Sequence, residues 1–238
     1  MRLISSLLLM LSLSSCQQDL SNVKLYKAGS FILVDTTAEA NQLLPFGNSN
    51  CDYPIYYKGV QTDTIKIGRR YWIGRTNWNE DIKMPWSRTY SSKTLEIYVD
   101  TLVKTNSPIE FISDSKTGGK NSTANYHSLL VSIKNISDSS IYLGRTFSLF
   151  YLHREARNKH GNWVPVDNNL SEAGLCLTGE PTIVLNPGEL ILSKLIRFKG
   201  AYTTDFRLCF GYGKNLVYSN TFRDQIEESV VDRVSFVE

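Results

Sequence analysis

Strand-like runs in the second half of the chain recur at a spacing of roughly ten residues, with turn residues between them. They include YHSLLVSIKN, which begins at Tyr126, and FRLCFGYG, which begins at Phe206. The turn NPGE separates the run TIVL from the run LILSKLIRF. This spacing is typical of an antiparallel sandwich, because βαβ units need a long helix between successive strands. The chain is therefore predicted to be all-β.

The turn at Pro187-Gly188 gives a specific prediction about the backbone. Proline presets φ at about −65°, and glycine accepts the positive φ that a type II turn requires at its third position. We therefore expect a positive φ at Gly188.

The first half of the chain also contains strand formers, but its pattern is less regular. VKLYKAGSFILVDTT gives two short strand-like runs hinged at Gly29, and residues 55–57 and 64–67 are predicted to form a hairpin. The run TLEIYVDTLV alternates apolar and polar residues, as a half-buried strand does. Residues 114–125 contain no large apolar side chain and are predicted to be a domain boundary or a long loop.

The segments VSIKNISDSSIYL, LNPGE and FRLCF carry a resemblance to a known kind of domain. Through these three segments, the block 109–222 resembles the immunoglobulin-like sandwich domains of many bacterial surface lipoproteins. The resemblance implies an antiparallel immunoglobulin-like β-sandwich, preceded by a second β-rich region at residues 23–105. Trp163 precedes both Cys176 and Cys209, so the usual order of the antibody core is absent. The tail, residues 223–238, fits a short helix, a last strand or a frayed end.

The amino-terminal segment has the pattern of a secretion signal. One cation, Arg2, precedes an apolar run of about ten residues, which is too short to span a bilayer. The sequence Leu13-Ser14-Ser15-Cys16 then resembles the lipobox of bacterial lipoproteins. The resemblance implies a signal peptide over residues 1–15, a lipid on the Cys16 thiol, an acylated new amino terminus (palmitate is the expected acyl group), and a lipidated tether over residues 16–22.

The residue after the cysteine bears on localisation. Gln17 replaces the aspartate that retains lipoproteins in the inner membrane, so the family's sorting pattern implies an outer-membrane anchor. Whether the protein faces the periplasm or the cell surface is left open by the sequence.

Charge and motifs exclude several classes of function. The formal net charge of +3 includes Arg2, so the mature chain is nearer neutral and no nucleic-acid partner is expected. The sequence contains no G-x-S-x-G, P-loop, G-x-G-x-x-G or H-E-x-x-H motif. It also contains no C-x-x-C motif, and no metal or cofactor is predicted. Besides Cys16, the chain has Cys51, Cys176 and Cys209, and a disulfide between the last two is left open.

One histidine and one carboxylate have a spacing suited to chemistry. His153 and Glu155 would share one face of a strand, where a carboxylate can orient an imidazole for acid–base work. Because Arg154 and Arg157 are adjacent and a turn follows at Gly161, the pair is interpreted as a solvated strand end.

Asp-Thr occurs three times, at Asp35, Asp63 and Asp100. Three aspartates could hold a cation together, but calcium needs about six oxygen ligands and the spacing fits no EF-hand loop. The pattern is therefore interpreted as three strand ends.

Residues 69–90 hold three of the four tryptophans together with several arginines. Tryptophan and arginine dominate binding hot spots, and flat aromatic faces also stack on sugar rings. The alternative is that the tryptophans fill a core, where each buries a large apolar area. The candidate binding surface consists of Trp72, Trp78, Trp86, Tyr71, Arg75 and Arg88.

These patterns together predict a lipid-anchored protein of the cell envelope that acts as a non-catalytic binding or structural module. Its expected partners are the membrane, through Cys16, and a glycan or an envelope protein. The alternative is an envelope hydrolase whose carboxylates meet only in the fold. A cleft with two carboxylates about 5–10 Å apart would favour that alternative.

Overall fold

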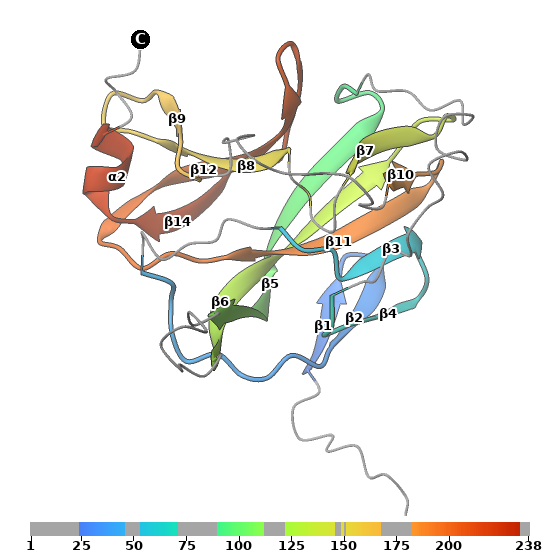
Figure 1. Ribbon diagram of the computed structural model, residues 1–238, viewed down its shortest axis with the longest axis horizontal. Coiled ribbons are helices and arrows are strands. Elements are labelled where there is room, and N and C mark those ends of the chain that lie inside the picture. Colours follow the sequence, from blue (N-terminus) through green and yellow to red (C-terminus); the bar gives the residue numbers. More distant parts are fainter. Residues whose placement is uncertain are drawn as a thin grey trace, which may run out of the picture.

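The protein is described from a computed structural model that covers residues 24–45, 53–70, 90–111, 122–145, 149, 151–167 and 182–233. Within these residues the fold is all-β, as predicted, and its strands pair mostly antiparallel (Figure 1). Three larger sheets are packed as layers, because the middle sheet contributes apolar side chains to two separate core clusters. None of the helices in the described part of the chain is long and apolar enough to cross a membrane.

The central sheet has the strand order β3-β11-β6-β5. Its strands are β3 (Tyr57–Val60), β11 (Glu189–Ile196), β6 (Ser122–Asn135) and β5 (Leu95–Phe111). Six consecutive residues of β11 are buried, a pattern typical of a strand that is covered on both faces. The register of β5 on β6 is interrupted between Asp100 and Lys104.

A smaller sheet covers one face of the central sheet. It has the order β1-β2-β4, with β1 (Lys24–Ala28), β2 (Phe31–Asp35) and β4 (Thr64–Ile67). Leu33 and Ile65 of this sheet pack against Leu130, Leu190 and Leu192 of the central sheet. The interface between the two sheets is therefore largely apolar.

A third sheet covers the opposite face. It contains β13 (Asn215–Tyr218), β12 (Tyr202–Tyr212), β8 (Leu152–Arg157) and β9 (Trp163–Pro165), and β14 (Phe222–Ile226) pairs with β12. Phe206, Leu208 and Phe210 share one core cluster with Val131 and Leu195 of the central sheet. A separate pair, β7 (Ile141–Arg145) with β10 (Thr182–Leu185), and the short helix α2 (Glu228–Arg233) complete the described elements.

Both glycine turns adopt the expected backbone. Gly29 has a φ of 58° between β1 and β2, and Gly188 has a φ of 74° before β11. The hinge and the turn predictions are confirmed. The tail forms both a strand, β14, and a short helix, α2.

The predicted hairpin at residues 55–67 is wrong. Strand β3 pairs with β11, and β4 pairs in parallel with β2, so the two runs belong to different sheets. Local alternation identifies a strand but carries no information about a partner far along the chain, and β3 meets β11 across more than a hundred residues.

The polar segment 114–125 is only partly a connection. Residues 112–121 lie outside the described part, but Ser122–Asn125 already belong to β6 and pair with the end of β5. Strand β5 itself runs continuously over Leu95–Phe111. The central sheet therefore takes strands from both of the regions distinguished in the sequence.

Candidate functional site

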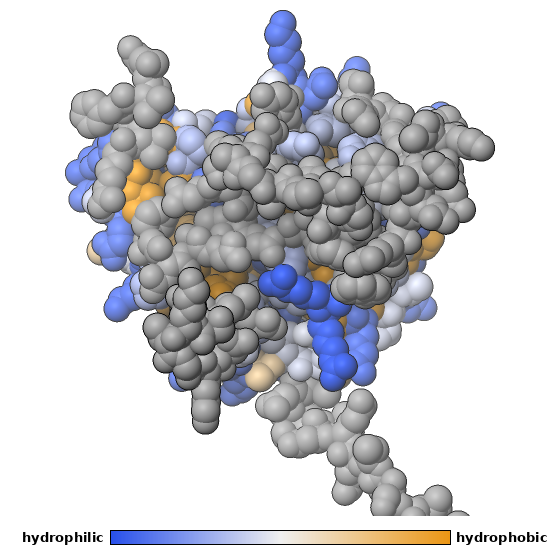
Figure 2. Space-filling view, viewed as in Figure 1, coloured by the Kyte–Doolittle hydropathy of each residue, from blue (hydrophilic) through white to orange (hydrophobic). Residues whose placement is uncertain are grey.

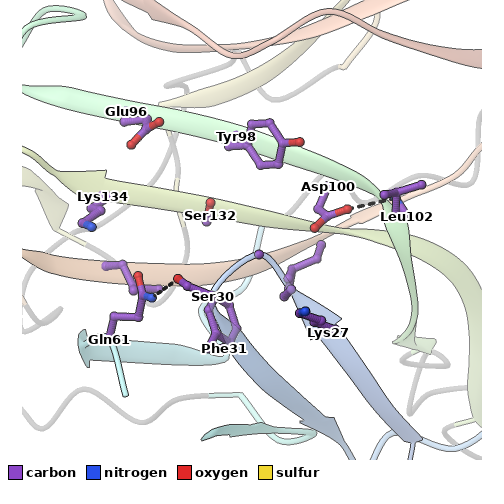
Figure 3. Close-up of a pocket in the computed structure, with 14 residues that line it drawn as sticks. Lys27, Ser30, Phe31, Gln61, Glu96, Tyr98, Asp100, Leu102, Ser132 and Lys134 are labelled. Carbon is purple, nitrogen blue, oxygen red and sulfur yellow. Dashed lines mark hydrogen bonds between the residues drawn. The ribbon is translucent and has the colours of Figure 1, made fainter. Parts of the chain in front are cut away.

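A groove with a volume of about 480 Å³ lies between the β1–β2 turn and the face of the central sheet (Figure 3). Its lining comes from β1, β2, β5, β6, β11 and the segment after β3. The residues that line it are Lys27, Ala28, Gly29, Ser30, Phe31, Gln61, Glu96, Tyr98, Asp100, Leu102, Leu130, Ser132, Lys134 and Leu190.

Strand alternation explains which side chains face the groove. Glu96 and Tyr98 point into it from β5, whereas the intervening Ile97 is buried in the core on the other face. The register of β5 on β6 places Glu96 opposite Lys134 and Tyr98 opposite Ser132. The sheet therefore presents a carboxylate, an ammonium group, a phenol and a hydroxyl side by side (Figure 3).

The opposite wall is the β1–β2 turn. The positive φ of Gly29 allows the chain to reverse there, and a left-handed backbone suits glycine best. Gln61 donates a hydrogen bond from Nε2 to the Ser30 hydroxyl at 2.5 Å (Figure 3). This bond ties the turn to the segment that follows β3 and fixes the position of the wall.

Asp100 has a structural task at one end of the groove. Its Oδ1 accepts hydrogen bonds from the backbone N–H groups of Leu102, at 2.9 Å, and Val103, at 3.2 Å. These bonds hold the irregular part of β5, where Leu102 stands 89% exposed. The carboxylate is therefore already occupied in shaping the backbone.

Four other polar side chains of the groove are available to a ligand. Lys27, Glu96, Tyr98 and Lys134 form no side-chain hydrogen bond or ion pair with any residue that the structure describes. Glu96 and Lys134 lie opposite each other without pairing, and Tyr98 is 48% exposed. The groove thus offers both signs of charge and the exposed aromatic ring of Tyr98.

The aromatic binding surface predicted from the sequence cannot be compared with this groove. Trp72, Trp78, Trp86, Tyr71, Arg75 and Arg88 all lie outside the described residues, as do Cys16, Cys51 and Cys176. Cys209 is described, and it is a buried free thiol.

His153 and Glu155 share a face of β8, but their interpretation as a solvated strand end is wrong. His153 is buried, and the side chain of Glu155 is only 15% exposed. The reason is pairing: β12 lies alongside β8 and places Cys209 opposite His153 and Arg207 opposite Glu155.

Contacts within this cluster shift the acidities of its members. Burial disfavours the imidazolium, but the hydrogen bonds and charges of Cys209 and Glu155 outweigh it and raise the pKa of His153 to about 9. Burial alone would raise the pKa of Glu155, but hydrogen bonds from His153 and Arg207 lower it below its usual value. The cluster is therefore strongly coupled.

The three aspartates of the Asp-Thr pattern have separate environments. Asp35 is buried and paired with Lys194, Asp63 lies next to the start of β4, and Asp100 holds the irregularity in β5. Asp35 ends β2 and Asp63 directly precedes β4, in agreement with their interpretation as strand ends, but that interpretation is wrong for Asp100, which lies inside β5.

Sequence reasoning missed the groove residues Lys27, Glu96 and Lys134. The alternation of apolar and polar residues in β5 indicates which face of the strand Glu96 occupies. The register of β5 on β6 and the position of the β1–β2 turn, by contrast, come from strand pairing. Comparisons with protein-family models, with characterised proteins and with solved structures found no match.

Proposed function

We propose that this chain is a lipid-anchored protein of the bacterial cell envelope and a non-catalytic binding module whose groove holds a glycan or a peptide. The observation that carries the proposal is the set of four groove side chains, Lys27, Glu96, Tyr98 and Lys134, that have no partner among the described residues. A few polar groups that converge on a groove are suited to recognition, because such groups fix the orientation of a ligand.

The chemistry of the groove defines the ligand class. Lys27 and Lys134 suit a carboxylate or phosphate, and Glu96 accepts hydrogen bonds from hydroxyl or amide groups. The exposed ring of Tyr98 offers a flat face and a hydroxyl. The ligand is therefore expected to be polar and to carry at least one acidic group.

The fold supports a finer proposal about architecture. The central sheet and the β12 sheet are antiparallel and share one apolar core. We propose that these two layers are an immunoglobulin-like sandwich, to which the small β1-β2-β4 sheet adds the groove wall.

The hydrolase alternative finds less support in the groove. Glu96 and Asp100 both line it, but they are four residues apart on one strand, which separates their Cα atoms by about 13 Å. Tyr98 lies between them, and Asp100 is engaged with the backbone. Because a glycosidase needs both carboxylates free to act on its substrate, the arrangement favours binding over hydrolysis.

Binding by the groove is tested with an array of acidic bacterial oligosaccharides and a panel of acidic peptides. Tyr98→Ala and Lys134→Ala are each expected to weaken the binding of any hit by about tenfold or more, which corresponds to about 1.4 kcal/mol. The matched control is Lys199→Ala, since Lys199 is also exposed but lies outside the groove. Equal affinity of all three variants, or no binding to either panel, would disprove the role of the groove.

The anchor is tested separately by Cys16→Ala. We expect the variant to lose fatty-acid labelling and to leave the membrane fraction or accumulate as an uncleaved precursor. Continued labelling of the variant would rule out lipidation at Cys16.

A further inference from the structure

A second cluster of chemically active side chains lies on the third sheet, away from the groove. His153 of β8 and Cys209 of β12 are directly opposite each other in the antiparallel pair. Glu155 is two residues further along β8 and therefore on the same face. One nitrogen of His153, the sulfur of Cys209 and one oxygen of Glu155 all lie within 4.8 Å of one another.

The cluster is buried but not fully satisfied. Cys209 has no exposed surface, and His153 is 8% exposed. Nδ1 of His153 is buried and forms no hydrogen bond with any residue in the described part of the chain. Buried polar atoms almost always have a partner, and a bound water or ion is one explanation of an exception.

We propose that His153, Glu155 and Cys209 bind a divalent metal ion with the ligand preference of Zn²⁺. Zinc accepts thiolate, imidazole and carboxylate ligands in tetrahedral geometry, and three protein ligands leave the fourth position to water. Magnesium and calcium take oxygen ligands almost exclusively, so the sulfur and nitrogen donors disfavour them.

Arg207 orients the carboxylate for this task. Its Nε donates a hydrogen bond to Oε2 of Glu155 at 2.6 Å, while Oε1 lies 3.8 Å from Nε2 of His153. The guanidinium of Arg207 is itself held over the rings of Trp163, at 4.3 Å, and Tyr218, at 3.8 Å. One carboxylate oxygen is thus fixed by arginine, and the other is directed toward the imidazole and the thiol.

Protons and charges balance in the bound state. On metal binding the imidazolium of His153 releases its proton to solvent, as does the Cys209 thiol, so that a neutral imidazole and a thiolate face the ion. One thiolate and one carboxylate then compensate the two positive charges of the ion. Without a metal, His153 and Glu155 form an ion pair, so metal binding is directly measurable.

The test is a titration with Co²⁺, which reports thiolate coordination by its charge-transfer absorption. The full chain is used in detergent with Cys16, Cys51 and Cys176 replaced by serine, so that Cys209 is its last thiol. We expect one equivalent of Co²⁺ to produce the absorption, and Zn²⁺ to displace it. Cys209→Ser should abolish the absorption.

Two further variants assign the other ligands. His153→Gln and Glu155→Gln should each weaken Co²⁺ binding by at least about tenfold, as loss of a metal-site contact does. The matched control is His160→Gln, because His160 is exposed and lies in the turn after β8. This control should bind Co²⁺ as tightly as the parent chain.

A measurement on the unmodified chain keeps the test decisive if a cysteine variant fails to fold. Zn²⁺ should raise the midpoint of urea unfolding of the parent chain, because a ligand that binds only the native state stabilises it. The shift should be absent in His153→Gln and present in His160→Gln. Absence of the shift in the parent chain, or an equal shift in His153→Gln, would overturn the proposal, as would an absorption that survives Cys209→Ser.

Discussion

Two regions of the molecule bury charged side chains, and the two regions differ in whether the polar atoms of those side chains have hydrogen-bond partners. Between the small sheet and the central sheet, the ammonium group of Lys194 is completely buried against Asp35. On the third sheet, His153 is also buried, but its Nδ1 has no partner among the described residues. A satisfied buried charge is typical of a structural contact, whereas an unsatisfied one is typical of a site.

The contacts of Lys194 are more numerous than its protons. Nζ donates to both carboxylate oxygens of Asp35, at 3.1 and 3.0 Å, to the Thr37 hydroxyl at 2.7 Å and to the Asn106 carbonyl at 2.7 Å. The ring of Tyr56 lies 4.6 Å away. Since β2 and β11 are not paired, this network links the two layers through side chains.

The same interface carries the groove. Leu130 and Leu190 contribute to the apolar contact between the layers and also line the groove. In the space-filling view, hydrophobic patches lie next to hydrophilic residues on the described part of this face (Figure 2). Loosening the small sheet should therefore affect binding as well as stability.

The largest expected effect is that of Lys194→Met. Methionine has a similar length but leaves the Asp35 carboxylate buried without its cation, which destabilises proteins by about 3–5 kcal/mol. Urea unfolding of the variant measures the loss. A loss below about 1 kcal/mol would show that the network contributes little to holding the small sheet.

The double variant Asp35→Asn with Lys194→Met sharpens this result. Oδ1 of Asp35 also accepts the backbone N–H of Thr37 at 2.9 Å, and the asparagine oxygen preserves that acceptor without a charge. Much of the lost stability should return, because a neutral pair leaves no buried charge.

The second effect is on the pH dependence of stability. Burial lowers the pKa of Lys194 from 10.5 to about 8, although the hydrogen bond and the charge of Asp35 act in the opposite direction. Between these two values the unfolded chain binds more protons than the native state, so the free energy of unfolding gains a rising contribution as the pH increases. Asp35 and Tyr56 are the titratable groups that face the ammonium.

Measurement from pH 8 to pH 10 in the parent chain and in Lys194→Met checks the sign. The difference in unfolding free energy between the two should grow with pH over this window. Parallel curves would show that Lys194 does not titrate there.

The sequence predicted most strands but few of their partners. The alternation around Ile97 and the turn at Gly188 are local properties of the sequence. The structure has a strand at the first and a positive φ at the second, as predicted. The pairing of β3 with β11, by contrast, depends on which distant strand covers the exposed edge. No local pattern contains that information.

The candidate sites show the same division. The spacing of His153 and Glu155 indicated a shared face, but only the register of β8 on β12 brings Cys209 to them. Similarly, no local pattern marks Lys194 as a buried residue. The layer formed by β1, β2 and β4 buries it, and that layer was not predictable as a cover for β11.

The third effect concerns backbone conformation, which should be equally important in both regions. Gly188, at a φ of 74°, precedes β11, and Gly161, at a φ of 81°, lies between β8 and β9. A side chain would meet no atom within 4 Å at either position, so the penalty for Gly188→Val or Gly161→Val is conformational. Each should lower the free energy of unfolding by at least about 1 kcal/mol. An unchanged melting temperature for either would show that its turn tolerates a branched residue.

The smallest effect is expected for His153→Leu, measured without added metal. Glu155 keeps its hydrogen bond with Arg207 at 2.6 Å, so no buried carboxylate is left alone. The contact between Nε2 of His153 and the Glu155 carboxylate is long at 3.8 Å, and removal of the imidazole also removes a buried nitrogen without a partner. The loss in unfolding free energy should therefore stay below that of Lys194→Met, because Glu155 keeps a cationic partner and Asp35 does not. Urea unfolding beside Lys194→Met makes the comparison direct. If His153→Leu is as damaging as Lys194→Met, the two buried clusters are alike, and His153 holds the third sheet together as Lys194 holds the small one.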